Sequence, residues 1–312
     1  MLQKIKKEIQ KVIVGQEDLL NSMLIALASG GHILIEGVPG IAKTTAVNSM
    51  ASSMGFDFKR VQFTPDLLPF DIIGNEILDI KNNEFKIKHG PIFTNLLLAD
   101  EINRAGAKVQ SALLEAMAEK QVTIGEDSFK LPYPFMVLAT ANPVEQDGTY
   151  DLPEASLDRF MMKVNVGYNT IDEEFEIVQR VAKKGFETIN QVANKEQFEN
   201  MIQEVKDIHI DDEVSKYILK IIFATREPKK YGLEDIASYI ECGVSPRASI
   251  DLYKASKAKA YLDGNDFVTP YDVAKVVFWV LGHRIVLNYN AINDNITVDN
   301  IIEKILEKID IP

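Results

Sequence analysis

Cysteine is almost missing from this chain of 312 residues. Cys242 is the only one, so no disulfide can form within the chain. Its four histidines are scattered and give no cluster of cysteine and histidine at zinc spacing. Glycine (17) and proline (12) are few, and 46% of the residues are hydrophobic, which excludes disorder of the whole chain. The composition is that of a globular protein from a reducing compartment.

Long apolar runs and excess positive charge are also lacking. The longest apolar runs, 96–99 and 276–281, are far shorter than the ~20 residues of a membrane-spanning helix. Residues 1–11 carry lysines but not the apolar segment of a signal peptide. The formal net charge is −12, which argues against bulk binding of nucleic acid or anionic membrane. We therefore expect a cytoplasmic protein without membrane insertion.

The two halves of the chain differ in pattern. At roughly 100–200 residues per domain, the length predicts two domains, which we place at 1–170 and 171–312. In the first half, short apolar runs alternate with helical patterns, which predicts a parallel sheet covered on both faces. Strands are expected at 32–36, 60–63, 96–99, 135–140 and 161–166, helices at 21–29, 44–54 and 107–119, and inserted β-hairpins at 75–88 and 121–131. After about residue 168 only helical periodicity remains, which predicts an all-α second domain.

The sequence GVPGIAKT, residues 37–44, lies between a predicted strand and a predicted helix. Such a turn can cradle phosphate, because its backbone N–H groups and the helix N-terminus face the ligand. Lys43 would reach the β- and γ-phosphates, and the Thr44 hydroxyl would bind Mg²⁺. Ala42 stands where a second glycine is usual, and we expect a normal helical backbone there because alanine disfavours positive φ. The alternative is a glycine turn with a surface lysine.

Two acids, Asp100 and Glu101, end the apolar strand 96–99. The carboxyl ends of parallel strands border the crevice in which α/β sheets bind ligands. Asp100 could hold Mg²⁺ through water, and Glu101 could orient and deprotonate an attacking water. A solvated strand end is the alternative, and the upstream phosphate loop weakens it.

Three further polar residues suit the same chemistry. Asn142 follows the next predicted strand and could contact the γ-phosphate or the water, although an Asn-Pro turn explains it equally well. Arg159, before the last strand, could stabilise a transferring phosphoryl group on a neighbouring subunit or form a surface ion pair with Asp158 or Glu154. Arg247 stands in the first turn of a predicted helix, where the dipole disfavours cations, so either a function or a neighbouring acid is expected.

These motifs, in this order, resemble those of the AAA+ ATPases, and the particular residues within them resemble the MoxR family. The matching phrases are VGQ at 14–16, GVPGIAKT, QFTPDLLP at 62–69, LADEINRA at 98–105, LATANPVEQDGTYDLPEASLDRF at 138–160, GVSPRA at 243–248 and His283-Arg284. They span nearly the whole chain. The fold implied is a P-loop α/β core with two hairpin inserts and a helical lid, as in the helix-2-insert clade shared with MCM helicases. Phe70 and Gly282 depart from the family's usual residues.

The resemblance assigns a role to each candidate residue. It implies Walker A residues Lys43 and Thr44, Walker B residues Asp100 and Glu101, a sensor 1 (Asn142), an arginine finger (Arg159) and a sensor 2 (Arg247) that acts in cis or in trans. The nucleotide and Mg²⁺ would be bound by Val14, Gly15, Gly37, Val38, Pro39, Gly40, Ile41, Ala42, Lys43, Thr44, Thr45 and Asp100. It also implies self-assembly into a ring, usually a hexamer, and a chaperone-like or cofactor-inserting action on a client, often one with a von Willebrand factor A domain.

Other functions of a P-loop protein fit the sequence less well. A nucleic-acid motor would need a basic track, but the second hairpin carries Glu126, Asp127 and Lys130. An assembly switch with little turnover would not need both Glu101 and Asn142. A small-molecule kinase would need neither an arginine directed at a neighbour nor a long lid. We therefore expect an ATP hydrolase that remodels a protein partner.

Overall fold

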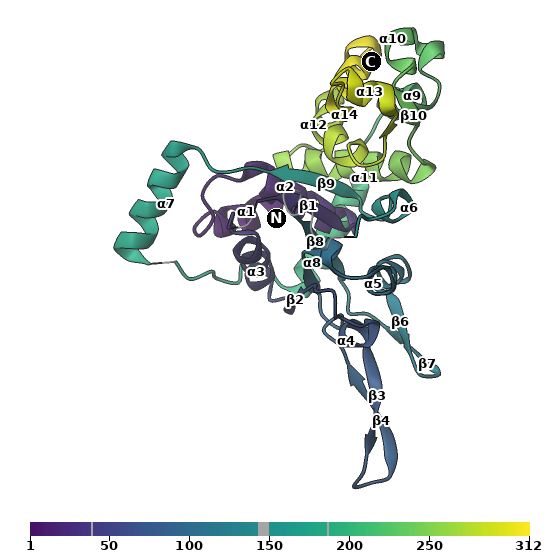
Figure 1. Cartoon of the computed structure of the whole chain (residues 1–312). Coiled ribbons are helices and arrows are strands. Elements are labelled where there is room, and N and C mark those ends of the chain that lie inside the picture. Colours follow the sequence, from purple (N-terminus) through teal and green to yellow (C-terminus); the bar gives the residue numbers. More distant parts are fainter. Residues whose placement is uncertain (39, 143–149, 186) are drawn as a thin grey trace.

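The centre of the molecule is a five-stranded parallel sheet, seen edge-on in Figure 1. The computed structural model describes residues 1–38, 40–142, 150–185 and 187–312. Strand order is β2-β5-β8-β1-β9, and every neighbouring pair is parallel. The strands are β1 (Ile33–Gly37), β2 (Phe58–Gln62), β5 (Leu96–Asp100), β8 (Met136–Ala141) and β9 (Met162–Val166). All five strands expected from the sequence are therefore confirmed.

Helices cover both faces of this sheet because its strands are apolar on both sides. In β5, Leu96 and Leu98 belong to one buried cluster, whereas Leu97 and Ala99 belong to the other. The first cluster includes α1 (Leu2–Ile9), α2 (Glu17–Ser29) and α3 (Lys43–Met54). The second includes α4 (Pro69–Ile73) and α5 (Ala107–Glu119), with η1 (Ile102–Arg104) between β5 and α5.

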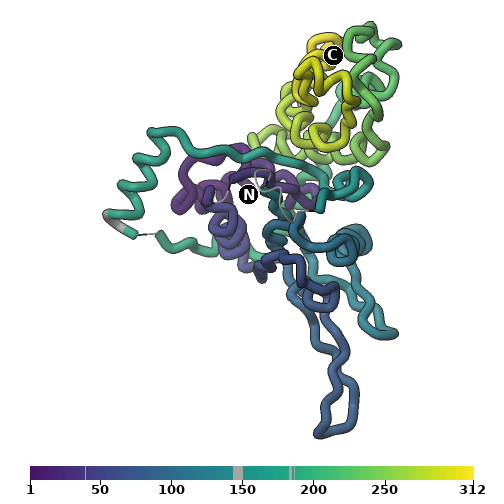
Figure 2. The backbone as a smooth tube through the Cα atoms, viewed as in Figure 1, coloured from purple at the N-terminus to yellow at the C-terminus, as the bar shows by residue number. Residues whose placement is uncertain are grey.

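Both predicted hairpins are present, and they project side by side from the core (Figure 2). The longer pairs β3 (Gly74–Asp79) with β4 (Glu84–His89), and the shorter pairs β6 (Gln121–Ile124) with β7 (Asp127–Lys130). The ring of His89 lies 4.0 Å from that of Phe93 and 5.3 Å from that of Phe129. This aromatic contact braces the shorter hairpin against the base of the longer one.

The C-terminal half is mainly helical. After α6 (Glu154–Leu157) and β9 come α7 (Ile171–Lys184), α8 (Lys195–Asp207), α9 (Asp212–Arg226), η2 (Pro228–Tyr231), α10 (Glu234–Ala237), α11 (Pro246–Asp263), α12 (Pro270–Leu281), α13 (Tyr289–Asn293) and α14 (Val298–Lys308). Thr269 caps α12 by accepting a hydrogen bond from the Asp272 amide. A small antiparallel sheet of β10 (Ile240–Cys242) and β11 (Val286–Leu287) was not expected, because runs of three and two residues carry no periodic signal.

The helical half is joined to the sheet by a continuous apolar core. One buried cluster runs from Ile33 and Ile35 of β1 through α2 to Leu252 of α11 and Val276 of α12. Helix α7 is the exception, since it stands apart from the other helices of the C-terminal half (Figure 1). The domain boundary at 170/171 stays a prediction. In the described part of the chain, no helix has the length and apolar character to cross a membrane.

Candidate nucleotide site

The carboxyl edge of the sheet gathers the predicted phosphate-binding residues. Gly37 ends β1, Asp100 ends β5, and Asn142 follows β8 by one residue. These three strands are neighbours in the sheet, so their parallel ends lie next to one another. Lys43 is the first residue of α3, the helix that begins after the loop that leaves β1.

Tight packing explains the glycine at position 37. A Cβ built there would lie 2.3 Å from the Val166 carbonyl oxygen of β9, so no larger residue fits without movement of the strand. Gly40 adopts φ 88°, a conformation that favours glycine. Between them lie Val38, which is half-buried, and Pro39, which lies outside the described residues.

The expectation for Ala42 was wrong. Its backbone is left-handed, with φ 58° and ψ 22°, where we expected a helical one. The residue is the N-cap of α3, so the chain turns from the loop into the helix at this point. A left-handed conformation costs an L-residue about 1–2 kcal/mol. Alanine, which has no γ atoms, is accommodated at an exposed position.

Lys43 points back into the loop. Its Nζ donates a hydrogen bond of 2.9 Å to the Gly37 carbonyl oxygen. Burial lowers the pKa of Lys43, while the charges of Asp100 and Glu101 act in the opposite direction. The ammonium group is therefore partly desolvated and close to both carboxylates, a setting in which a phosphate would be strongly attracted.

Two hydrogen-bond partners hold the Asp100 carboxylate in place. Its Oδ1 accepts a hydrogen bond of 2.6 Å from Thr140 Oγ1, and its Oδ2 accepts one of 3.0 Å from Arg60 Nε. Its carboxylate and the hydroxyl of half-buried Thr44 are hard oxygen donors of the type Mg²⁺ prefers. Among the described residues, no group of three or more His, Cys, Asp or Glu side chains that could hold a metal ion occurs.

Glu101 has a strained backbone, with φ 57° and ψ 52°. Its amide donates to Thr140 Oγ1 at 2.8 Å, so one hydroxyl contacts both acids. Glu101 Oε2 accepts a hydrogen bond from Gln62 Nε2 at 2.7 Å and forms an ion pair with Arg104 Nε at 3.1 Å. Thr140, Gln62 and Arg104 were not predicted as site residues. Only the polar ends of strands 60–63 and 135–140 could have indicated two of them.

Asn142 lies beside this pair, because β8 neighbours β5. Its side chain is 9% exposed and already takes part in polar interactions. Buried polar side chains generally have at least one hydrogen-bond partner, which fixes their orientation. Residues 143–149, which belong to the long family-like phrase after Asn142, lie outside the described residues.

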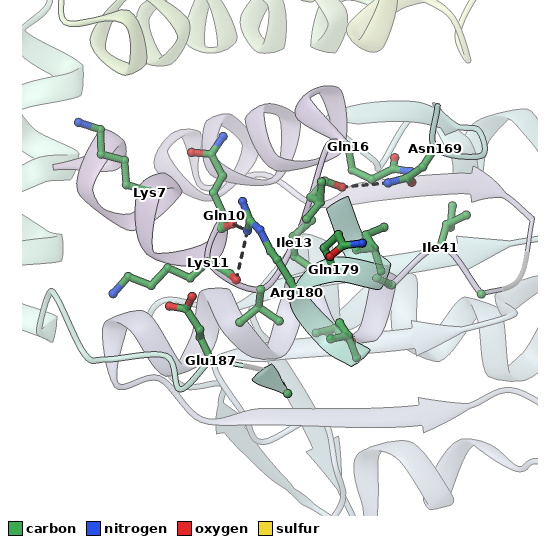
Figure 3. Close-up of a pocket in the computed structure, with 18 residues that line it drawn as sticks. Lys7, Gln10, Lys11, Ile13, Gln16, Ile41, Asn169, Gln179, Arg180 and Glu187 are labelled. Atoms are coloured by element: carbon green, nitrogen blue, oxygen red, sulfur yellow. Dashed lines mark hydrogen bonds between the residues drawn. The ribbon is translucent and has the colours of Figure 1, made fainter. Parts of the chain in front are cut away.

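A cavity of about 760 Å³ extends from the phosphate loop between α1 and α7 (Figure 3). Its size suits a small-molecule ligand. Val14 lines it, as do Ile41, Ala42 and Thr45 of the loop and α3. Gly15 does not line it: a Cβ at this position would lie 2.3 Å from Glu173 Oε1 of α7.

The contribution of α7 to this cavity was not expected. Arg180 donates from Nη1 to the Gln10 carbonyl oxygen at 2.8 Å, and Ile177 and Val181 of the same helix line the cavity. Asn169, just before α7, donates to the Val14 carbonyl oxygen at 3.0 Å (Figure 3). The sequence showed α7 as an amphipathic helix but did not show which surface it covers.

The two predicted arginines lie at the opposite, amino edge of the sheet. Arg159 comes three residues before Met162, which pairs with Ile33 at the start of β1. At ~3.3 Å per residue, five-residue β9 separates this edge from the phosphate loop by roughly 16 Å. Arg159 is exposed, and within the described ranges its side chain has no hydrogen bond or ion pair. The alternative ion pair with Asp158 or Glu154 is therefore not formed.

Arg247 has the neighbouring acid that its position in the first helical turn suggested. Its Nη1 donates to the Asp158 carbonyl oxygen at 3.2 Å and lies 3.4 Å from Asp158 Oδ2. Ser245 caps the same helix, α11, and accepts a hydrogen bond from the Arg247 amide at 3.2 Å. Arg247 is thus bound to the residue directly before Arg159.

Known proteins share this arrangement. Residues 32–162 match the family described as "ATPase family associated with various cellular activities (AAA)", and residues 234–305 match the "AAA lid domain". The protein named Chaperone MoxR1 from Mycobacterium tuberculosis is 44% identical over 98% of this chain and 81% of its own length. The chain belongs to the MoxR family of AAA+ ATPases.

Two further relatives agree over the whole length. The Bacillus subtilis protein YeaC, which is named as uncharacterized, is 42% identical over 100% of this chain and 95% of its own. A crystal structure of a candidate ATPase from Cytophaga hutchinsonii superimposes with a TM-score of 0.93 at 48% identity. It covers 99% of this chain and 94% of that one, so the sheet and the helical half form one shared AAA+ architecture.

Proposed function

We propose that the protein hydrolyses ATP with Mg²⁺, assembles into a ring, most simply a hexamer, and uses the cycle to remodel a partner protein. The convergence of Lys43, Asp100 and Glu101 at the carboxyl edge of the sheet carries this proposal. Membership of an ATPase family supports it. The cavity beside Val14 offers room for the base and sugar, with the phosphates directed toward Lys43.

Each residue has its own role in ATP hydrolysis. Lys43 and the loop amides bind the phosphates, and Thr44 and Asp100 would hold Mg²⁺, which neutralises phosphate charge. Glu101 accepts a proton from the attacking water. Water oxygen bonds to the γ-phosphorus as the bridging P–O bond breaks, which gives ADP and phosphate. Asn142 orients the water or the γ-phosphate.

The arginines serve the site of the next subunit. Roughly 16 Å of sheet separates Arg159 from the phosphate loop of its own chain. A head-to-tail interface would bring Arg159 of one chain to the ATP of the next, and such interfaces close into rings. Arg247 is bound to Asp158, next to Arg159, which favours action in trans for Arg247 as well.

The name of the chaperone relative supports a protein client. We propose maturation of, or cofactor insertion into, this client, with a von Willebrand factor A domain as its recognition module. Glu126 and Asp127 on the shorter hairpin and the net charge of −12 oppose a nucleic-acid track. We expect the ring in the cytoplasm.

Subunit mixing tests the shared site. Arg159→Ala keeps Glu101 and Glu101→Gln keeps Arg159, so each variant alone should bind ATP but not turn it over. In a mixture, junctions that join an intact Glu101 to an intact Arg159 should restore part of the turnover. No gain on mixing, despite co-assembly shown by affinity-tag pull-down, would contradict the trans arrangement.

Client capture tests the second part of the proposal. Glu101→Gln should hold ATP without hydrolysis, so a client that binds the ATP state should stay bound. Proteins recovered with Glu101→Gln in ATP, but not with Lys43→Ala, are clients. Recovery of nucleic acid instead, with DNA-stimulated turnover of the wild-type protein, would replace the protein client by a nucleic acid.

A further inference from the structure

The backbone on either side of Arg159 is held by one buried residue of the helical half. Arg284 follows α12, and its side chain is 1% exposed. Its Nη2 donates to the Asp158 carbonyl oxygen at 3.1 Å and to the Phe160 carbonyl oxygen at 2.9 Å. His283 Nε2 donates to the same Phe160 oxygen at 2.9 Å. The peptide groups flanking Arg159 therefore have fixed positions.

The Asp158 carboxylate is the second point of attachment. It accepts hydrogen bonds from Arg284 Nε at 2.9 Å and from Ser245 Oγ at 3.0 Å, and Arg247 lies at 3.4 Å. Arg284 also donates to Asp251 Oδ2 at 2.6 Å. Arg284, the buried member of this network, thus faces two carboxylates, and this pairing makes the burial of its charge tolerable.

Arg159 itself is left out of this network. Its side chain is exposed, and in the portion of the chain that the structure describes it makes no polar contact, although its neighbours make many. Asp158, the residue before it in the chain, already binds Arg284, Arg247 and Ser245. The backbone at Arg159 is fixed, while its guanidinium group has no polar contact within the described chain. We expect this arrangement of a group that acts on a ligand outside its own chain.

We propose that Arg284, acting through Asp158, is a positioning residue that holds Arg159 in place for the neighbouring subunit, so that the helical half of one chain sets hydrolysis in the next. This inference rests on the proposed function of Arg159. The competing explanation is that Arg284 only joins the helical half to the sheet. A joining role would affect every function of a chain, whereas a positioning role affects only what the chain does for its neighbour.

Arg284→Lys is the informative substitution. Lysine keeps the positive charge but loses the planar fork that reaches Asp158, Phe160 and Asp251 together. The assay measures how well a donor chain supplies Arg159 to its neighbour. Arg159→Ala, which keeps Glu101, is mixed with a donor that cannot itself hydrolyse ATP, either Glu101→Gln or Arg284→Lys/Glu101→Gln. We expect the double variant to support turnover roughly tenfold to a hundredfold lower than Glu101→Gln, because small misplacements of a reacting group are costly.

The reciprocal mixture tests the same substitution on the receiving side. Arg284→Lys, with its own Glu101 intact, is mixed with excess Glu101→Gln as donor. Turnover per intact Glu101 should equal that measured when Arg159→Ala is mixed with the same excess of Glu101→Gln. Arg226→Lys/Glu101→Gln is the matched control donor, since Arg226 Nε donates to the Val244 carbonyl oxygen within the helical half, and it should donate as well as Glu101→Gln.

The possible results are distinct. Full donation by Arg284→Lys/Glu101→Gln, or an equal loss as donor and as receiver, would overturn the positioning role. Failure of Glu101→Gln and of the control donor, with co-assembly shown, would refute the trans finger itself and the inference with it. If Arg284→Lys does not fold by circular dichroism, Asp158→Asn replaces it in both mixtures with the same expected asymmetry.

Discussion

The two edges of the sheet are built in different ways. At the carboxyl edge, Lys43, Asp100 and Glu101 lie within one residue of strand or helix ends, and they are held by contacts within the α/β core that join residues at most 40 positions apart. At the amino edge, the position of Arg159 depends on Arg284, 125 residues further along the chain. The arrangement of the first edge therefore rests on contacts within the α/β core, whereas that of the second depends on how the two halves of the chain pack.

The largest effect should follow a change at the amino edge that leaves ATP binding intact. Arg159→Ala removes a guanidinium that offsets charge on the transferring phosphoryl, and such arginines contribute roughly 10³–10⁵ in kcat. Calorimetry should show nearly normal ATP affinity, and a phosphate-release assay should show almost no turnover. Lys229→Ala removes an exposed cation elsewhere and should behave as wild type. Loss of ATP affinity in Arg159→Ala would place this residue in its own chain's site.

A change at the carboxyl edge should instead remove binding. Lys43→Ala deletes the contacts of one ammonium group to the β- and γ-phosphates, each contributing on the order of 1.5–3 kcal/mol. Calorimetry should therefore detect no ATP binding at micromolar protein concentration. Lys108→Ala, an exposed lysine at the start of α5, is the control. Unchanged affinity of Lys43→Ala would remove the phosphate site from this loop.

Glu101 separates binding from chemistry within the carboxyl edge. Glu101→Gln keeps the side-chain shape and removes the base, so ATP should still bind while hydrolysis falls by roughly 10²–10⁴. Single-turnover measurement with saturating protein isolates the chemical step. Glu115→Gln, on the exposed face of α5, should hydrolyse ATP normally. Turnover of Glu101→Gln at the wild-type rate would move the base to another residue.

The smallest expected effect is the sensitivity of the amino edge to acid. Burial lowers the pKa of His32 to about 4 and that of His283 to about 3. His32 accepts a hydrogen bond from the Val137 amide at 3.0 Å, and His283 contacts Phe160. Both are neutral when folded, so their stabilisation is complete above the unfolded pKa of about 6.5 and is lost as pH falls toward 4.

The measurable consequence is a pH-dependent free energy of unfolding. At pH 5.5 the two histidines together should lower it by about 3 kcal/mol relative to pH 7.5. Urea unfolding at both pH values measures this change. His32→Gln combined with His283→Gln should flatten the difference, and His209→Gln, at an exposed position, should not. An unchanged difference in the double variant would exclude the two histidines as its cause.

Sequence predicted the carboxyl edge well because its signals are local. A strand, a loop and a helix follow one another within 32–54, and the acids directly follow an apolar run. The left-handed backbone of Ala42 was missed because loop conformation depends on the surrounding chain. The contacts of Gln62 and Arg104 with the Glu101 carboxylate were missed for another reason. They depend on the register of β2 and on the turn after β5.

Long-range packing limited the remaining predictions. No periodicity shows that α7 covers the cavity beside Val14, or that Arg180 contacts Gln10 about 170 residues away. The same holds for Arg284 and Asp158, whose contact joins segments 126 residues apart. β10 and β11 are too short to carry a pattern, and their pairing joins the segments that precede α11 and follow α12.

The dependence of turnover on protein concentration tests the central claim most directly. If Arg159 completes the site of the next chain, ATP turnover per chain should rise with protein concentration and level off once the assembly forms, as followed by light scattering in the same samples. Turnover per chain that stays constant from dilute monomer to assembled protein would contradict a site shared between subunits.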